Sequence, residues 1–131
     1  MPSFSSYLLH APKKMRIVAI LWTLLIFVAC LIPGDEIPEV QVPLADKWVH
    51  FIIFGGFSFF WLCTFKRAVA KTGIIMLFVA IALGYLVELL QGSGITTGRS
   101  YDLYDVLADG IGGLLGVLFF FMLKRYRKRT P

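Results

Sequence analysis

Residues 99–113 read Arg-Ser-Tyr-Asp-Leu-Tyr-Asp-Val-Leu-Ala-Asp-Gly-Ile-Gly-Gly, and residues 114–123 continue as Leu-Leu-Gly-Val-Leu-Phe-Phe-Phe-Met-Leu. One arginine and three aspartates therefore open a run that is apolar apart from Gly116. Ionisable groups at the start of a membrane-spanning helix raise the free energy of inserting that helix, so they are expected to have partners or a function. This stretch predicts a transmembrane helix with a polar site at its first turns.

The composition of the whole chain agrees with a membrane protein. Of its 131 residues, 58% are hydrophobic and 16% are charged, and the mean hydropathy is +0.78. Soluble domains average roughly 45–50% apolar and about 25% charged residues. We expect one domain over residues 1–131. Cys30 and Cys63 lie inside apolar runs without metal-ligand spacing, so we expect no disulfide framework and assign no metal ligands from the sequence.

Four apolar stretches approach the ~20 residues that a transmembrane helix needs. They cover residues 15–32, 47–65, 72–91 and 103–123. Three prolines make residues 33–45 a loop. Asp46 is a good N-cap for the second helix and Thr72 for the third, which Gly92 helps to end. The expected fold is all-α, a four-helix transmembrane bundle.

The charges predict the orientation. Eleven of the thirteen basic residues lie near the N-terminus, in residues 66–71 or in the C-terminal tail. With four spans these regions share one side, which the positive-inside rule makes cytoplasmic, with both termini. All eight acidic residues, with Lys47 and Arg99, lie in or beside the two opposite loops. The net charge of +5 therefore indicates orientation and contact with anionic membrane lipid, and we expect no nucleic-acid partner.

Polar residues of three helices should meet at the outer side. Each helix carries them along one face, and a four-helix bundle points such faces at one another. The predicted ligand-binding residues are Asp46, Lys47, His50, Glu88, Gln91, Arg99, Asp102, Asp105 and Asp109.

The deepest of these charges should face the interior of the bundle. An acid that meets lipid well inside a span costs roughly 2.5–3.5 kcal/mol, so Glu88 and Asp109 should be paired or protonated. Arg99 is expected to hold a carboxylate in a bidentate manner, which lysine cannot do. Close helix packing is the expected role of three small residues: Gly112, Gly113 and Gly116.

These motifs carry a family resemblance. Asp46-Lys47-x-x-His50, Glu88-x-x-Gln91 and Arg99-x-x-Asp102-x-x-Asp105-x-x-x-Asp109-x-x-Gly112 together resemble the VanZ-like membrane protein family over residues 45–118. That family is named for a protein associated with low-level teicoplanin resistance. The resemblance implies a multi-pass protein of the bacterial cytoplasmic membrane with a role in the cell envelope and antibiotic resistance. At Asp109 the family more often has asparagine, so the resemblance implies no catalytic role for an ionised Asp109.

Three functions fit these residues. The first is a binding protein whose outer polar pocket holds an envelope lipid head group, an envelope precursor or another lipid-linked ligand. Lys47, His50, Gln91 and Arg99 would supply hydrogen-bond donors, and the carboxylates would orient them.

The second function is an intramembrane enzyme acting on an envelope lipid or carrier, with His50, Glu88 and Asp105 as candidate catalytic residues. His50 would be a general base oriented by Asp46 or Glu88; alternatively, His50 with Glu88, Asp105 and Asp109 would hold a divalent cation. The third function is a small transporter or proton relay, for which four spans would have to form an oligomer. The sequence identifies no cofactor and leaves open whether the protein is an enzyme.

Overall fold

The computed structural model describes residues 11–38 and 41–129, which form four α-helices and one short 3-10 turn. The α-helices are α2 (Pro12–Leu31), α3 (Ala45–Leu62), α4 (Ala70–Gly92) and α5 (Leu103–Arg129), and the turn is η1 (Gly34–Glu36). No strand occurs in these ranges. The all-α prediction is confirmed.

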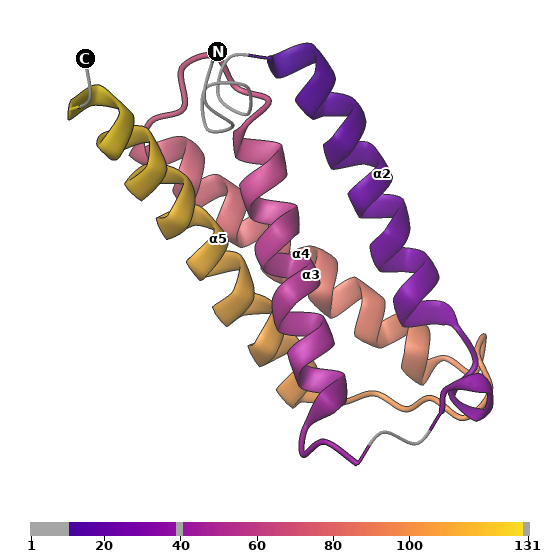
Figure 1. Ribbon diagram of the computed structural model, residues 1–131. Coiled ribbons are helices and arrows are strands. Elements are labelled where there is room, and N and C mark those ends of the chain that lie inside the picture. Colours follow the sequence, from indigo (N-terminus) through magenta and orange to yellow (C-terminus); the bar gives the residue numbers. More distant parts are fainter. Residues whose placement is uncertain (1–10, 39–40, 130–131) are drawn as a thin grey trace.

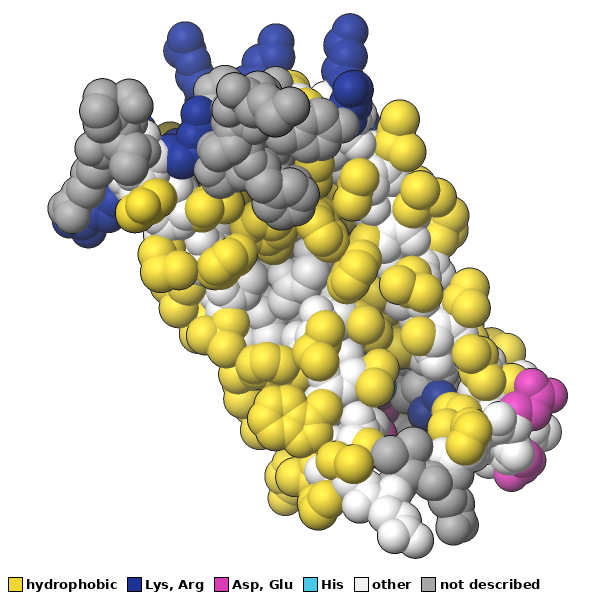
Figure 2. Space-filling view, in the orientation of Figure 1, with side chains coloured by type: hydrophobic (Ala, Val, Ile, Leu, Met, Phe, Trp, Pro, Cys, Tyr) yellow, Lys and Arg dark blue, Asp and Glu magenta, His cyan; other side chains and the backbone are white. Residues whose placement is uncertain are grey.

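The helices lie side by side as a bundle (Figure 1). α5 packs against both α3 and α4, and α2 packs mainly against α3. Residues 32–44 and 93–102 connect helices at one end of the bundle, which we call the acidic end; residues 63–69, the start of α2 and the end of α5 form the basic end. Figure 2 shows Lys and Arg side chains gathered mostly at the basic end and Asp and Glu at the acidic end.

The surface between the two ends is apolar. Large apolar side chains of three helices point outward, with Ile17, Leu21, Phe78 and Met122 each between 61% and 67% exposed. Soluble monomers rarely expose a continuous surface of this kind. α2, α4 and α5 are each long and apolar enough to cross a membrane. This is a membrane protein, and the crossing of α3, whose first turns carry charges, stays a prediction.

Glycines bring the backbones of α3 and α5 together. A side chain at Gly112 would collide with the carbonyl oxygen of Phe51, and one at Gly116 would collide with the carbonyl oxygen of Gly55. Both obstructing atoms are backbone, which cannot move aside as a side chain can. The close approach places the first turns of α3 and α5 against each other, where the polar residues lie.

Two predicted helix starts are wrong by two residues. α3 begins at Ala45, so Asp46 lies in its first turn; the N-cap is Leu44, in the left-handed region with φ of 57°. α4 begins at Ala70, and the Thr72 hydroxyl accepts a 3.2 Å hydrogen bond from the Val69 N–H. Both polar side chains therefore act within the first turn, where a carboxylate or hydroxyl oxygen is also favourable.

The last helix is longer than predicted. α5 continues to Arg129 and takes in most of the basic tail, whereas the sequence predicted an end at residue 123. Lys and Arg are good helix formers, and their charges favour the C-terminal end of a helix. Most of the basic tail is thus helical and continuous with α5.

Candidate functional site

A lysine ammonium joins three carboxylates at the acidic end. Lys47 Nζ lies 2.9 Å from Asp46 Oδ2, 2.8 Å from Asp102 Oδ2 and 3.0 Å from Asp105 Oδ1. Asp102 is outside the helices, and its hydrogen bond from Lys47 lowers the pKa of its carboxyl group below the ordinary value. Lys47 thereby ties the start of α3 to the start of α5.

Asp102 also connects α4 to α5. Its Oδ1 accepts a 2.8 Å hydrogen bond from the Tyr104 N–H, which caps the N-terminus of α5. Its own backbone N–H donates a 2.8 Å hydrogen bond to Glu88 Oε2. Glu88 is fully buried, so this contact fixes a carboxylate of α4 inside the site.

His50 and Asp109 form a buried pair below the lysine. His50 Nδ1 lies 3.0 Å from Asp109 Oδ1, and the two residues are 3% and 0% exposed. In the neutral tautomer that donates from Nδ1 to this carboxylate, Nε2 is an acceptor. Nε2 faces Asp105 Oδ2 at 4.0 Å.

Gly84 makes room for this pair. A Cβ at Gly84 would lie only 2.8 Å from Asp109 Cβ and closer still to the carboxylate. Any larger residue at position 84 would push Asp109 away from His50.

Gln91 and Arg99 hold the end of α2. Gln91 Nε2 donates to the Cys30 carbonyl at 2.7 Å. Arg99 Nε donates to the Ile32 carbonyl at 3.1 Å, and its Nη2 lies 3.4 Å from the Ala29 carbonyl. The predicted carboxylate partner of Arg99 is thus replaced by backbone oxygens. The last carbonyls of a helix lack intrahelical donors, which makes them good partners for a guanidinium group.

The site holds more acceptors than donors. Five carboxyl groups (Asp46, Glu88, Asp102, Asp105 and Asp109) surround one ammonium and one imidazole. Among the described residues, Glu88 Oε1 and Asp109 Oδ2 are buried without a hydrogen-bond partner. Buried polar atoms are normally paired, so such a pair calls for an explanation. The surplus suits a ligand that brings positive charge or hydrogen-bond donors.

A cavity of about 480 Å³ opens beside these residues. Its walls come from the end of α2, the segment after it and the start of α3. Three polar side chains line it: Asp46, His50 and Arg99. Most of the remaining lining is aliphatic and includes Ile32, Ile37, Val42, Leu44 and Val49. A cavity with an apolar wall and a few polar groups is typical of a ligand site.

The sequence of this chain is similar to those of known proteins. Residues 4–124 match the VanZ/LLP1 family. The chain belongs to the VanZ/LLP1 family. It is also 31% identical over 112 residues to the uncharacterized protein C11E3.10 of Schizosaccharomyces pombe; the alignment covers 84% of this chain and 65% of that protein. No solved structure matches the chain.

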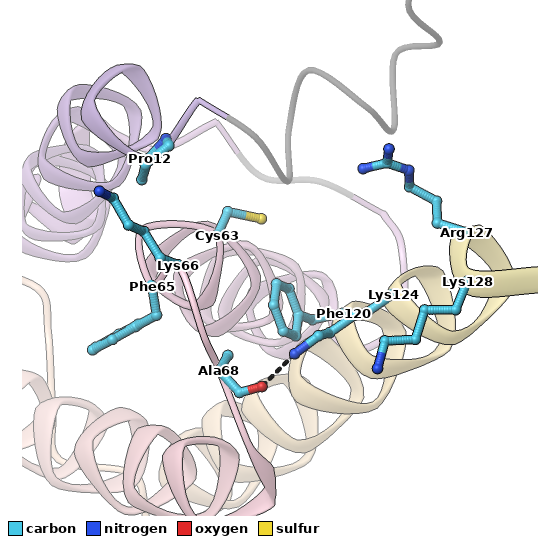
Figure 3. Close-up of a pocket in the computed structure, with 9 residues that line it drawn as sticks. All are labelled: Pro12, Cys63, Phe65, Lys66, Ala68, Phe120, Lys124, Arg127 and Lys128. Carbon is cyan, nitrogen blue, oxygen red and sulfur yellow. Dashed lines mark hydrogen bonds between the residues drawn. The ribbon is translucent and has the colours of Figure 1, made fainter.

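A second hollow of this VanZ/LLP1 protein lies at the basic end. It has a volume of about 530 Å³ and is lined by Lys66, Lys124, Arg127 and Lys128 together with apolar residues. Figure 3 shows these side chains around the hollow, with Lys124 donating to the Ala68 carbonyl oxygen. The described residues that line this hollow are basic or apolar, whereas the carboxylates and the imidazole of His50 described above lie at the acidic end.

The structure brings the predicted site residues together at the acidic end, but not in every predicted pairing. Asp46 and Glu88 were the expected orienting partners of His50, whereas the structure gives Asp109. Asp46 instead contacts Lys47. The sequence does contain an indication that Asp109 enters the site. Gly84 lies one turn before Glu88 on α4, and its missing side chain leaves room for a residue of α5.

Proposed function

We propose that this VanZ/LLP1 protein binds the polar head group of an envelope lipid in the cavity at the acidic end. The observation that carries the proposal is the lining of that cavity, which combines an aliphatic wall with Asp46, His50 and Arg99. An amphiphile matches this arrangement, because its chain can lie against the wall while its head group meets the polar side chains.

The charge balance suggests the chemistry of the head group. The carboxylate of Asp46 in the lining favours an amine or hydroxyl groups, which donate hydrogen bonds. Arg99 at the cavity edge favours a phosphate, which guanidinium groups bind well. We therefore propose a phosphorylated head group that also carries donors, such as a phosphoethanolamine or a sugar phosphate.

The membrane side follows from the charge distribution. Because basic residues gather at one end and acidic residues at the other, the positive-inside rule supports a cytoplasmic basic end and an extracytoplasmic pocket. The VanZ resemblance supports the bacterial cytoplasmic membrane and a role in the response of the envelope to glycopeptide antibiotics.

Lipid capture tests the proposal. The full chain in mild detergent is incubated with phosphatidylethanolamine in the presence of a chelator and analysed by native mass spectrometry. The wild type should retain the lipid, and Arg99→Ala should retain at least tenfold less. The matched control is Arg16→Ala, an exposed arginine near the basic end, which should behave as the wild type.

A second variant guards against an indirect effect of Arg99 on α2. Val49→Trp fills the cavity from its wall without removing a polar group, and it should also reduce retention. Equal retention by the wild type, Arg99→Ala and Val49→Trp would refute the proposed pocket.

A second candidate function is an intramembrane enzyme acting on the same class of lipid. The His50–Asp109 pair favours it, because an imidazole oriented by a carboxylate is a common general base. Glu88 and Asp105 would complete the candidate catalytic set. Radiolabelled lipid incubated with the protein should return unchanged from a binding protein; a product that disappears with His50→Ala would instead indicate the enzyme.

A further inference from the structure

We propose that His50, Glu88 and Asp105 form a binding site for a divalent transition-metal cation. One ligand atom of each residue lies within 4.8 Å of those of the other two. All three residues are buried, with exposures of 3%, 0% and 7%. Of the three residues, His50 also lines the cavity described above.

The histidine is already oriented for a metal. When the neutral imidazole donates from Nδ1 to Asp109 at 3.0 Å, its unprotonated Nε2 faces Asp105 Oδ2 at 4.0 Å. A ligating histidine generally donates its other N–H to a carboxylate or carbonyl, which fixes the tautomer and the ring orientation. Asp109 would thus be a positioning residue for the site.

The spacing suits two ligands of one ion. His50 Nε2 and Asp105 Oδ2 are 4.0 Å apart, which is too long for a hydrogen bond. Two ligands of a tetrahedral Zn²⁺, each about 2.0–2.2 Å from the metal, lie roughly 3.4 Å apart. A small side-chain rotation would therefore bring both atoms onto one cation.

Glu88 provides an independent indication. It is fully buried, and its Oε1 has no hydrogen-bond partner among the described residues. The other oxygen, Oε2, is held by the Asp102 N–H, so the carboxylate is anchored with one oxygen available. A buried carboxylate with one unpaired oxygen, on a residue grouped with His50 and Asp105, is the arrangement that a cation stabilises.

The outer carboxylates behave differently. Asp46, Asp102 and Asp105 also lie within reach of a common ion, but one oxygen of each already contacts the Lys47 ammonium, which occupies the space between them. Asp105 uses Oδ1 for Lys47 and directs Oδ2 toward His50. The proposed metal site is therefore the inner set alone.

The ligand set indicates the metal class. Imidazole suits Zn²⁺ and other transition metals, and carboxylates suit harder cations such as Mn²⁺. Three protein ligands leave at least one coordination position for water or a ligand. The two metals to test are therefore Zn²⁺ and Mn²⁺, and their binding needs no lipid.

Metal binding by the full chain tests this inference. Protein in detergent is stripped with a chelator, dialysed against Zn²⁺ or Mn²⁺ without added lipid, and analysed for bound metal. The wild type should bind close to one equivalent of at least one metal. His50→Ala and Glu88→Gln should bind at least tenfold more weakly, while Glu36→Gln, which changes an exposed carboxylate of η1 outside the site, should bind as the wild type does.

Two further measurements separate ligation from misfolding. Cu²⁺-loaded wild type should show one imidazole nitrogen by electron paramagnetic resonance, a test that needs no variant. Asp109→Asn keeps an acceptor for Nδ1 and should retain the metal with roughly 10–100-fold lower affinity. No stoichiometric metal in the wild type, no imidazole signal, or equal binding by Glu88→Gln would overturn the inference. Because lipid capture is measured with a chelator, either proposal can fail without the other.

Discussion

Lys47→Met should destabilise the acidic end strongly, because it leaves three carboxylates without their cation. The Asp105 and Lys47 side chains are 10% and 21% exposed. Breaking a buried ion pair by removing one partner costs about 3–5 kcal/mol. Pairs with exposed groups are worth roughly 0.2–1 kcal/mol, and Asp46 and Asp102 are 51% and 34% exposed. The loss at Asp105 is scaled down because that pair is partly exposed. The three lost ion pairs together should then lower the free energy of unfolding by about 3 kcal/mol.

The measurement is reversible unfolding of the full chain in mixed micelles, driven by sodium dodecyl sulfate and followed by tryptophan fluorescence. The matched control is Lys66→Met at the basic end, which removes a lysine distant from these carboxylates and should change the free energy of unfolding by less than about 0.5 kcal/mol. A second control is Lys47→Met in an Asp105→Asn background, where the loss should be clearly smaller. If Lys47→Met were as stable as Lys66→Met, Lys47 would not hold these three carboxylates together.

The same lysine predicts a pH dependence. Lys47 holds the pKa of Asp102 in the folded protein below the ordinary value of 3.8. At pH values between the folded-state pKa and 3.8, the unfolded chain therefore binds more protons than the folded chain. The stabilisation is therefore fully present above pH 3.8 and is lost as the pH falls through the folded-state pKa. Unfolding titrations at several pH values should show this loss in the wild type and a weaker one in Lys47→Met. An identical pH dependence in the two proteins would contradict the assignment.

Three further outcomes follow from the packing and the charges. Gly84→Ala should displace Asp109 and weaken metal binding by roughly 10–100-fold, whereas Gly110→Ala, where a Cβ would meet only the Ile81 side chain at 3.5 Å, should not; equal affinities would contradict the role of Gly84. Gly112→Ala should lower the free energy of unfolding in micelles by about 1–3 kcal/mol, because its Cβ would meet backbone of α3, and an unchanged value would mean that α3 and α5 can separate. A reporter fused after residue 131 should be cytoplasmic in a bacterial host, and an external reporter would reverse the orientation.

The fold was accessible from the sequence because its main signals are strong. Apolar runs near the length of a membrane span and charges confined to their ends leave few alternatives to a helical bundle. The helix boundaries were less accessible. The N-cap Leu44 has a left-handed backbone, which no sequence rule assigns to leucine, and the basic tail reads equally well as a solvated segment or a helix.

The site was accessible only as a set of residues. Helical periodicity places the acids of residues 102–109 on one face and predicts that they meet His50, but pairings depend on the rotation and axial offset of neighbouring helices. Those are determined by close contacts such as Gly112 against Phe51 and Gly84 against Asp109. Arg99 is the clearest example of a pairing that the sequence cannot predict. Its partners are backbone carbonyls, and because every residue has one, no sequence pattern distinguishes them.

The way the last turn of α2 is completed has a consequence for the order of assembly. Its Ala29 and Cys30 carbonyls, and that of Ile32 just beyond, accept hydrogen bonds from Arg99 and Gln91, residues that are synthesised some sixty to seventy positions later. Domains tend to fold from the N-terminus during synthesis, so the last turn of α2 lacks these donors until the end of α4 and the loop after it are synthesised. Arg99, which completes α2, also lines the proposed lipid pocket, and a chain truncated before Gln91 would leave the last carbonyls of α2 without these hydrogen bonds.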